Sequence, residues 1–220
     1  MATVTPFDVW ERGSWCGQEV AGEQYYVKGW RSLLPRMLPT QGVELTDHAL
    51  LIREPTNRHD RNAVRVEIRD RPVGHLPAED AERYRPVLDH LAAGGFAARV
   101  QARIWASPEF EFQYDRRGEV READTGRVRC RISLALPEPH LLIPMNAPPF
   151  EPHTMLPMGG SVMVNSGGVP MSVFEPVLND AGEGWAYATL QEIHEQLTRS
   201  TRELIEVRIN GRRAGQMTPR

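Results

Sequence analysis

Two short apolar segments flank a long polar loop, and this arrangement constrains the fold of the chain more than any other feature. Ala49-Leu-Leu-Ile52 and Val64-Arg-Val-Glu-Ile68 have the apolar or alternating character of β-strands that bury one face. The loop between them, from Arg53 to Val64, is rich in residues that form turns and hydrogen bonds: Asn57, His59, Asp60 and Asn62. Loops held by a rigid sheet commonly carry binding function. We therefore expect a sheet that presents this loop.

The residues that follow continue the pattern of a small β fold with one clear helix. A tight turn at Arg69-Asp70 leads to a third strand over residues 71–76. A helix begins near Pro77, because proline and acidic residues suit a first helical turn. Gly94-Gly95 ends this helix, whose predicted buried stripe is Ala81, Tyr84, Leu88 and Leu91. Residues 96–106 return to strand alternation, with Ala98, Val100, Ala102 and Ile104 on the buried face.

The segments on either side complete the first module. Residues 1–18 are expected to form a partly ordered leader, and β-favouring aromatic residues predict a strand between Val20 and Trp30. Residues 33–48 are predicted to be a loop, 109–127 a charged hairpin tip and 128–136 a further strand.

These elements together predict the fold class. It is mainly β (α+β), a small OB-like or SH3-like β-barrel with one or two helices, and it occupies residues 19–136. Residues 137–170 contain eight prolines and two Gly-Gly pairs, so a linker or irregular arm is expected there. Residues 171–220 are predicted to hold a short helix at 190–196 and a hairpin at 204–218 that turns at Asn210-Gly211.

The last hairpin aligns without gaps with the one that follows the polar loop. Residues 65–76 and 206–217 share identical residues at four aligned pairs of positions, which are 66/207, 68/209, 71/212 and 74/215. Either the second unit is a diverged, C-terminally incomplete copy of the first module, or two unrelated hairpins share ordinary alternation. In both cases, residues 194–201 do not reproduce the polar loop, so we expect no second copy of its binding site.

Composition narrows the function classes. The net charge of −3 argues against a general phosphate binder. Lys28 is the only lysine among 26 basic residues, and an arginine excess reflects either bidentate phosphate contact or a GC-rich genome. No run reaches the ~18 apolar residues of a membrane span, and the first residues do not form a secretory signal. The two isolated cysteines suit a reducing cytoplasm, where we expect the protein to reside.

Three separated sequence blocks resemble the HIRAN family. They are Gly22-Glu-Gln-Tyr-Tyr26, the block from Leu51 to Val64, and Val73-Gly-His-Leu-Pro77, in the order and spacing of a HIRAN domain over residues of about 19–105. The resemblance implies a modified OB-type β-barrel that binds nucleic acid. In the helicase-like transcription factor, the HIRAN domain binds single-stranded DNA at a free 3′-hydroxyl end. Bacterial members occur alone or beside nucleases and helicases, which are therefore candidate partners.

The resemblance also implies roles for individual residues. Tyr25 lies at the position that stacks on a terminal base, and Asp60 at the position that accepts a hydrogen bond from the 3′-hydroxyl group and repels a 3′-phosphate. Asp60 alternatively shapes the loop through an Asx-turn. Asn57 either contacts the terminal nucleotide or forms a turn, Asn62 is expected to bond the loop backbone, and His75 is expected to donate to a phosphate.

Three positions depart from the family pattern. Gln24 stands where an arginine precedes the paired tyrosines, His59 where an aromatic residue precedes the loop aspartate, and Ala78 where a lysine begins the helix. The lost positive charge could be replaced by Lys28, Arg58 and Arg61. These changes point either to weaker affinity for ordinary DNA or to a different ligand.

Other function classes have less support. His59-Asp60 is an adjacent pair of potential metal ligands, but the sequence shows no further His/Asp set on helices and no GxSxG, Walker A or GxGxxG motif. We therefore expect no enzymatic activity, no metal and no cofactor. The leading hypothesis is a single-stranded-DNA-binding module in DNA repair, replication or defence. The alternative is a protein-interaction adaptor that binds no nucleic acid.

Overall fold

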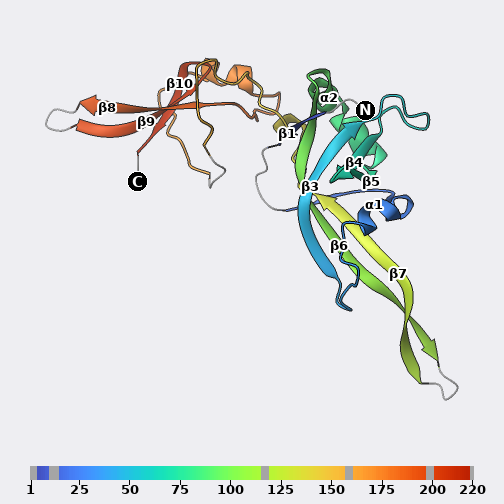
Figure 1. Ribbon diagram of the computed structural model, residues 1–220. Coiled ribbons are helices and arrows are strands. Elements are labelled where there is room, and N and C mark those ends of the chain that lie inside the picture. Colours follow the sequence, from blue (N-terminus) through green and yellow to red (C-terminus); the bar gives the residue numbers. More distant parts are fainter. Residues whose placement is uncertain (1–3, 10–14, 115–118, 157–160, 197–200, 219–220) are drawn as a thin grey trace. The chain divides into compact units, whose positions relative to one another are not determined.

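The computed structural model describes residues 4–9, 15–114, 119–156, 161–196 and 201–218. The chain divides into two compact units, Met1–Leu142 and Ile143–Arg220, and each is considered by itself (Figure 1).

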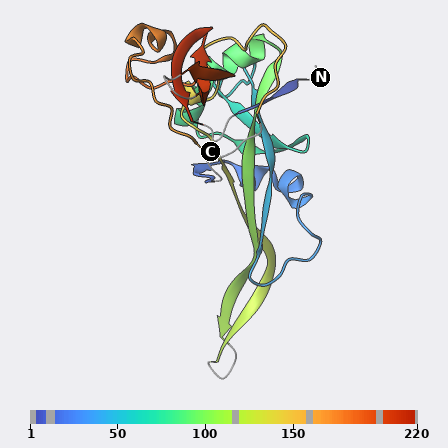
Figure 2. The same ribbon diagram turned by 90° about the vertical axis from the view of Figure 1, so that its left-hand side faces the viewer.

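The first unit is built on one curled, mostly antiparallel sheet. Its strands run in the spatial order β2-β7-β6-β3-β4-β5, and β1 pairs in parallel with β6. The strands are β1 (Thr5–Asp8), β2 (Gln18–Glu19), β3 (Val43–Arg53), β4 (Val64–Ile68), β5 (Arg71–His75), β6 (Phe96–Tyr114) and β7 (Val120–Leu134). Beyond the curled part, β6 and β7 extend as a long two-stranded arm (Figure 2).

A short segment after β2 connects the two ends of this strand order. Val20 donates its backbone N–H to Ile132 on β7 at 2.9 Å, and Ala21 pairs with His75 on β5. The curled sheet therefore becomes a partial barrel, which confirms the predicted mainly β, OB-like fold class.

Helix α2 (Ala78–Ala93) follows the prediction closely. Its predicted stripe is buried, and the helix ends where Gly94 donates its N–H to the carbonyl oxygens of His90 and Leu91. The buried face of β6 is also as predicted: Ala98, Val100, Ala102 and Ile104 are at most 1% exposed. The turn at Arg69-Asp70 has positive φ at both residues, as a two-residue hairpin turn of the primed type requires.

Three local predictions are wrong. The segment predicted to be a strand forms the 3₁₀ helix η1 (Glu23–Tyr25) and helix α1 (Val27–Arg31), because Trp30 is buried and its indole N–H donates to the Glu23 carbonyl oxygen at 2.9 Å. The predicted loop at 33–48 instead contains the start of β3, which pairs with β6 from Val43 onward. The predicted helix at 190–196 is strand β8, since it pairs along its whole length with β9.

The second unit contains a three-stranded antiparallel sheet in the order β10-β9-β8. Its strands are β8 (Thr189–Gln196), β9 (Thr201–Ile209) and β10 (Arg212–Met217), which confirms the hairpin predicted around Asn210-Gly211. Two short 3₁₀ helices, η3 (Met171–Val173) and η4 (Glu175–Val177), precede the sheet. Another, η2 (Pro139–Leu141), lies at the end of the first unit.

Candidate nucleic-acid interface

The polar loop between β3 and β4 is held by a buried arginine. The Arg53 side chain is only 6% exposed, and its Nη1 donates to the carbonyl oxygens of Asn62 and Ala63, both at 2.9 Å. Its Nε contacts Asp89 Oδ1 on α2 at 2.8 Å. The C-terminal half of the loop is therefore attached to helix α2.

Asn57 organises the N-terminal half of the loop. Its Oδ1 accepts the backbone N–H groups of His59 at 3.0 Å and Asp60 at 3.4 Å, while its Nδ2 donates to Glu54 Oε2 at 3.1 Å. These contacts support the turn-forming interpretation of Asn57, because both ends of its amide are used within the protein.

Asp60 also shapes the loop, but it keeps one oxygen available. Its Oδ1 accepts the Asn62 backbone N–H at 2.7 Å, which is the geometry of an Asx-turn. Within the described part of the chain, Oδ2 makes no hydrogen bond and the side chain is half-buried. The neighbouring residues Arg58, His59 and Arg61 are exposed. The two roles considered for Asp60 are thus compatible in this geometry.

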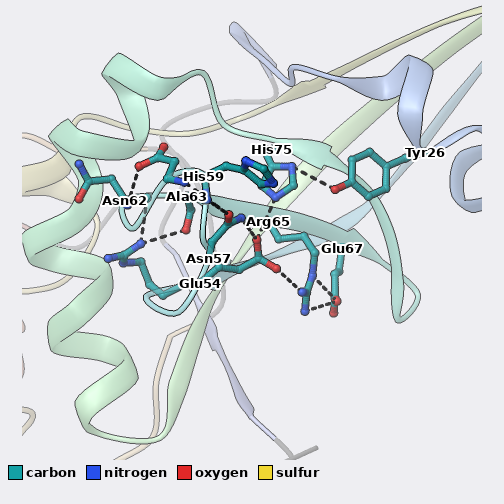
Figure 3. A network of polar contacts seen from close by, with 11 residues as sticks. Tyr26, Glu54, Asn57, His59, Asn62, Ala63, Arg65, Glu67 and His75 are labelled. Atoms are coloured by element: carbon teal, nitrogen blue, oxygen red, sulfur yellow. Dashed lines mark hydrogen bonds and ion pairs between the residues drawn. The ribbon is translucent and has the colours of Figure 1, made fainter.

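A chain of polar contacts links the loop to Tyr26, the second of the two adjacent tyrosines (Figure 3). Glu54 Oε2 lies 3.1 Å from His75 Nε2, and His75 Nδ1 lies 3.4 Å from the Tyr26 hydroxyl group. Arg65 forms an ion pair with Glu54 and a second one with Glu67, the latter at 2.8 Å. The sequence pattern did not single out Glu54 or Tyr26, yet they connect the two halves of the predicted site.

The electrostatics of Glu54 reflect this position. Partial burial alone would raise the pKa of its carboxyl group. Hydrogen bonds from His75 and Asn57 and the charge of Arg65 outweigh the burial, so the pKa lies below its ordinary value. Glu54 is therefore a stable anion at neutral pH, and it holds His75 and Asn57 in fixed orientations.

The 3₁₀ helix η1 ends at Tyr25 and leaves this aromatic side chain in solvent. Tyr26 is half-buried against the His75 ring, whereas the neighbouring Tyr25 side chain is exposed, with 82% of the residue accessible. Gly29 allows α1 to lie against β5, because a Cβ at this position would lie closer than 3.0 Å to the Pro72 carbonyl oxygen on β5. Only glycine permits so close an approach of α1 to the sheet.

The close approach of α1 to β5 creates a groove of about 640 Å³ beside Tyr25. Besides Tyr25, its walls come from α1 and its flank and from the start of β5: Gln24, Tyr26, Val27, Lys28, Gly29, Arg71 and Pro72. The two cations, Lys28 and Arg71, line the same groove as the exposed aromatic ring. This is the combination that suits a nucleotide, with a stacking surface for the base and positive charge for phosphate.

The structure thus divides the predicted site residues into three sets. Gln24, Tyr25 and Lys28 line the groove, and His75 is connected to it through Tyr26. Asn57, His59 and Asp60 lie in the loop, connected to His75 through Glu54. Arg58 and Arg61 are also in the loop, and none of these five loop residues lines the groove. Arg71 was not among the predicted site residues, because no local sequence pattern connects it with Tyr25 and only the fold brings the two into one groove.

Two features of the described residues bear on other classes of site. No group of three or more His, Cys, Asp or Glu side chains there is arranged to hold a metal ion. No helix within the described ranges is long and apolar enough to cross a membrane.

Comparison with known proteins identifies the family. The model of the HIRAN domain matches residues 16–133, a range that includes the polar loop, α1, α2 and most of the curled sheet. No curated protein and no solved structure matched the chain. Because the family model covers more than half of the sequence, the chain belongs to the HIRAN family, whose domain is a nucleic-acid-binding module.

Proposed function

We propose that the first unit binds single-stranded DNA at a free 3′-hydroxyl end. The observation that carries this proposal is the exposed Tyr25 ring, which shares one groove with Lys28 and Arg71. Such an aromatic surface gains from stacking against a base, by about 1–3 kcal/mol per base.

Lys28 and Arg71 supply the positive charge that Gln24 lacks. Both line the groove beside Tyr25, whereas Arg58 and Arg61 do not. Arg71 stands at the first position of β5 and is exposed, so its guanidinium group can form the paired hydrogen bonds that suit a phosphate. In this proposal, Lys28 and Arg71 contact the phosphates that precede the terminal nucleotide.

Asp60 selects the end of the strand. Its uncommitted Oδ2 can accept a hydrogen bond from a 3′-hydroxyl group, while its negative charge opposes a phosphate at the same place. His75 has both ring nitrogens within hydrogen-bond distance of Glu54 and Tyr26, so its proposed role is to fix Tyr26 beside the groove. The role of the unit is binding, without catalysis.

A tyrosine comparison tests whether the groove binds nucleic acid. Tyr25→Ala should weaken binding of a 3′-hydroxyl oligonucleotide by about 5- to 150-fold, which corresponds to the loss of one stacked base. Tyr114→Ala is the matched control, because Tyr114 is similarly exposed (76%) but lies near the end of β6 on the arm. Fluorescence anisotropy with labelled single strands gives both affinities. Equal losses in the two variants would contradict a specific role for Tyr25.

Salt dependence distinguishes this function from an adaptor role. Loss of Lys28 and Arg71 should lower the slope of log affinity against log salt by about 0.7 for each phosphate contact removed. The alanine variant of Arg202, an exposed residue on β9, controls for total charge. No binding of any oligonucleotide at low salt would favour a protein-interaction adaptor. The wider role we propose is in DNA repair, replication or defence, beside nuclease or helicase partner proteins.

A further inference from the structure

A second, larger groove adjoins the one beside Tyr25. It has a volume of about 770 Å³ and shares Gln24 and Val27 with the smaller groove. Its walls come from η1 and α1 on one side and from β3, β6 and β7 on the other. A chain leaving the Tyr25 groove over Gln24 and Val27 would therefore enter this second groove.

The second groove combines arginine and tryptophan. Arg103, Arg129 and Arg131 line it together with Trp105, which is 40% exposed. In the sheet, Trp105 and Arg131 are direct partners across β6 and β7, so their side chains lie on one face. The guanidinium group of Arg103 also lies over the ring of the exposed Trp15, 5.8 Å from its centroid.

The arginines of this groove can replace their carboxylate partners with phosphate groups. Glu23 and Glu44 oppose the three arginines, but Glu23 already accepts the Ile132 backbone N–H. The side chains of Arg129 and Arg131 remain 67% and 71% exposed, although they contact Glu109 and Glu19. Exposed ion pairs of this kind contribute little, about 0–1 kcal/mol, so a phosphate can replace the carboxylate.

We infer that the second groove binds the 5′ continuation of the single strand whose 3′ end lies beside Tyr25. This inference rests on the proposed function and specifies its footprint. Arginines would contact successive phosphates, and Trp105 and Trp15 would offer stacking surfaces for bases, as in other surfaces that bind single strands. The long β6–β7 strands would thus contribute to binding as well as to the barrel.

Oligonucleotide length tests this inference. The full chain is titrated with 5′-labelled dT3 and dT10, both ending in a 3′-hydroxyl group. The wild type should bind dT10 at least tenfold more tightly than dT3. Arg103→Ala/Arg131→Ala should remove most of that advantage and leave dT3 affinity within about twofold. Arg127→Ala is the control, because Arg127 is an exposed residue of β7 that does not line the groove.

The outcomes separate the two proposals. If Tyr25→Ala weakens binding of both oligonucleotides but Arg103→Ala/Arg131→Ala changes neither affinity, the proposed function stands and the inference about the second groove is overturned. If the wild type binds neither oligonucleotide, the proposed function itself fails. Circular dichroism of each variant shows whether the fold is retained. Arg103→Ala/Arg131→Lys should bind dT10 more tightly than Arg103→Ala/Arg131→Ala if charge is what matters.

An independent observation concerns the second unit. Hairpins β4–β5 and β9–β10 have the same register when residue numbers are shifted by 141, and each has its irregularity at the corresponding place, beside Val73 in one and Ala214 in the other. The corresponding pairs are Arg65–His75 with Glu206–Gln216, Val66–Gly74 with Val207–Gly215, Glu67–Pro72 with Arg208–Arg213, and Ile68–Arg71 with Ile209–Arg212.

The surroundings of the two hairpins also correspond. Ala21 pairs with His75 through two backbone hydrogen bonds, and Asn165 pairs with Gln216 in the same way. A Cβ at Gly74 or at Gly215 would lie closer than 3.0 Å to the valine that precedes the bridging residue, Val20 in the first unit and Val164 in the second. Beyond the hairpin, the pair Leu51–Val66 corresponds to Leu190–Val207.

We infer from these correspondences that the second unit is an incomplete HIRAN-type core. The order of a bridging segment, two short helices and three antiparallel strands is the same in both units. The connection between β8 and β9 spans only residues 197–200, whereas ten residues, 54–63, separate β3 from β4. The second core therefore lacks the loop that carries Asp60, and we expect one DNA strand per chain.

Hydrogen exchange and stoichiometry test the second core. The amides of Asn165 and Gln216 should be protected, as should those of Ala21 and His75. Gly215→Ala should accelerate exchange at Asn165 and Gln216 but not at Ala21 and His75. Titration should end at one oligonucleotide per chain. Unprotected Asn165 and Gln216 amides in the wild type, or two oligonucleotides bound per chain, would overturn this assignment.

Discussion

Gly29→Ala provides a test in which local and tertiary effects have opposite signs. Alanine is a better helix former than glycine by about 1 kcal/mol, so helix propensity alone predicts that the variant is more stable. In the structure, however, the new Cβ would lie closer than 3.0 Å to the Pro72 carbonyl oxygen, and a backbone atom of a paired strand cannot rotate away.

The expected magnitude follows from this clash. Relief requires a shift of α1 from β5, which would expose part of the buried Trp30 and separate Lys28 from Arg71. Overpacking typically costs about 1–3 kcal/mol, and we place this case near the upper end because the neighbour is backbone. After subtraction of the helix-propensity gain, the first unit should lose about 2 kcal/mol of stability.

Two measurements check this prediction. Urea unfolding monitored by tryptophan fluorescence gives the change in the free energy of unfolding, and anisotropy gives the affinity for a 3′-hydroxyl oligonucleotide. Val27→Ala is the stability control, because Val27 is an exposed residue of the same helix and should change stability by less than about 0.5 kcal/mol. A Gly29→Ala variant as stable as the wild type, or more so, would refute the packing of α1 on β5.

Three further predictions concern stability and reactivity. Tyr84→Phe should cost about 1 kcal/mol in urea unfolding, because the buried Tyr84 hydroxyl group donates to the Pro137 carbonyl oxygen at 2.7 Å; an unchanged midpoint would contradict this contact. The pKa of Glu54 is lowered on folding, so the ionised carboxylate stabilises the folded protein above about pH 4.5, and this contribution is lost as the pH falls further. Glu54→Gln should therefore flatten the dependence of the free energy of unfolding on pH below about pH 4.5. Burial raises the pKa of the Cys130 thiol to about 12, so a thiol reagent at pH 8 should label Cys130 far more slowly in the native than in the urea-unfolded protein; equal rates would argue against its burial.

Much of the first unit follows from local patterns in the sequence. The stripe on α2 and the alternation on β6 were predictable because periodic apolar residues report directly which face is buried. The turns at Arg69-Asp70 and Asn210-Gly211 were predictable because short turns with positive φ favour particular residues.

The errors lie where tertiary contacts override local preference. Tyr25, Tyr26 and Val27 have β-favouring side chains, but the burial of Trp30 and the docking of Gly29 on β5 select short helices. In β8, Leu190 and Ile193 are three residues apart, a spacing that also suits a helix, and only pairing with β9 identifies the strand.

The candidate site was located by its loop but not by its contacts. Asn57 and Asp60 act within a few residues of their own positions, so their turn-forming roles could be inferred from sequence. Glu54 connects to His75, 21 residues away, and Arg71 shares a groove with Lys28, so neither role has a local pattern. Long-range partnerships of this kind become visible only once the sheet register is known.

The most direct test of end recognition compares two ligands that differ at one group. Wild-type protein and Asp60→Asn are titrated with the same single strand ending in a 3′-hydroxyl group or a 3′-phosphate. A hydrogen bond to a charged acceptor contributes about 1.5–3 kcal/mol, so the wild type should prefer the 3′-hydroxyl strand by at least tenfold, and Asp60→Asn should lose most of this preference. Equal affinity of the wild type for the two strands would contradict recognition of the 3′ end by Asp60.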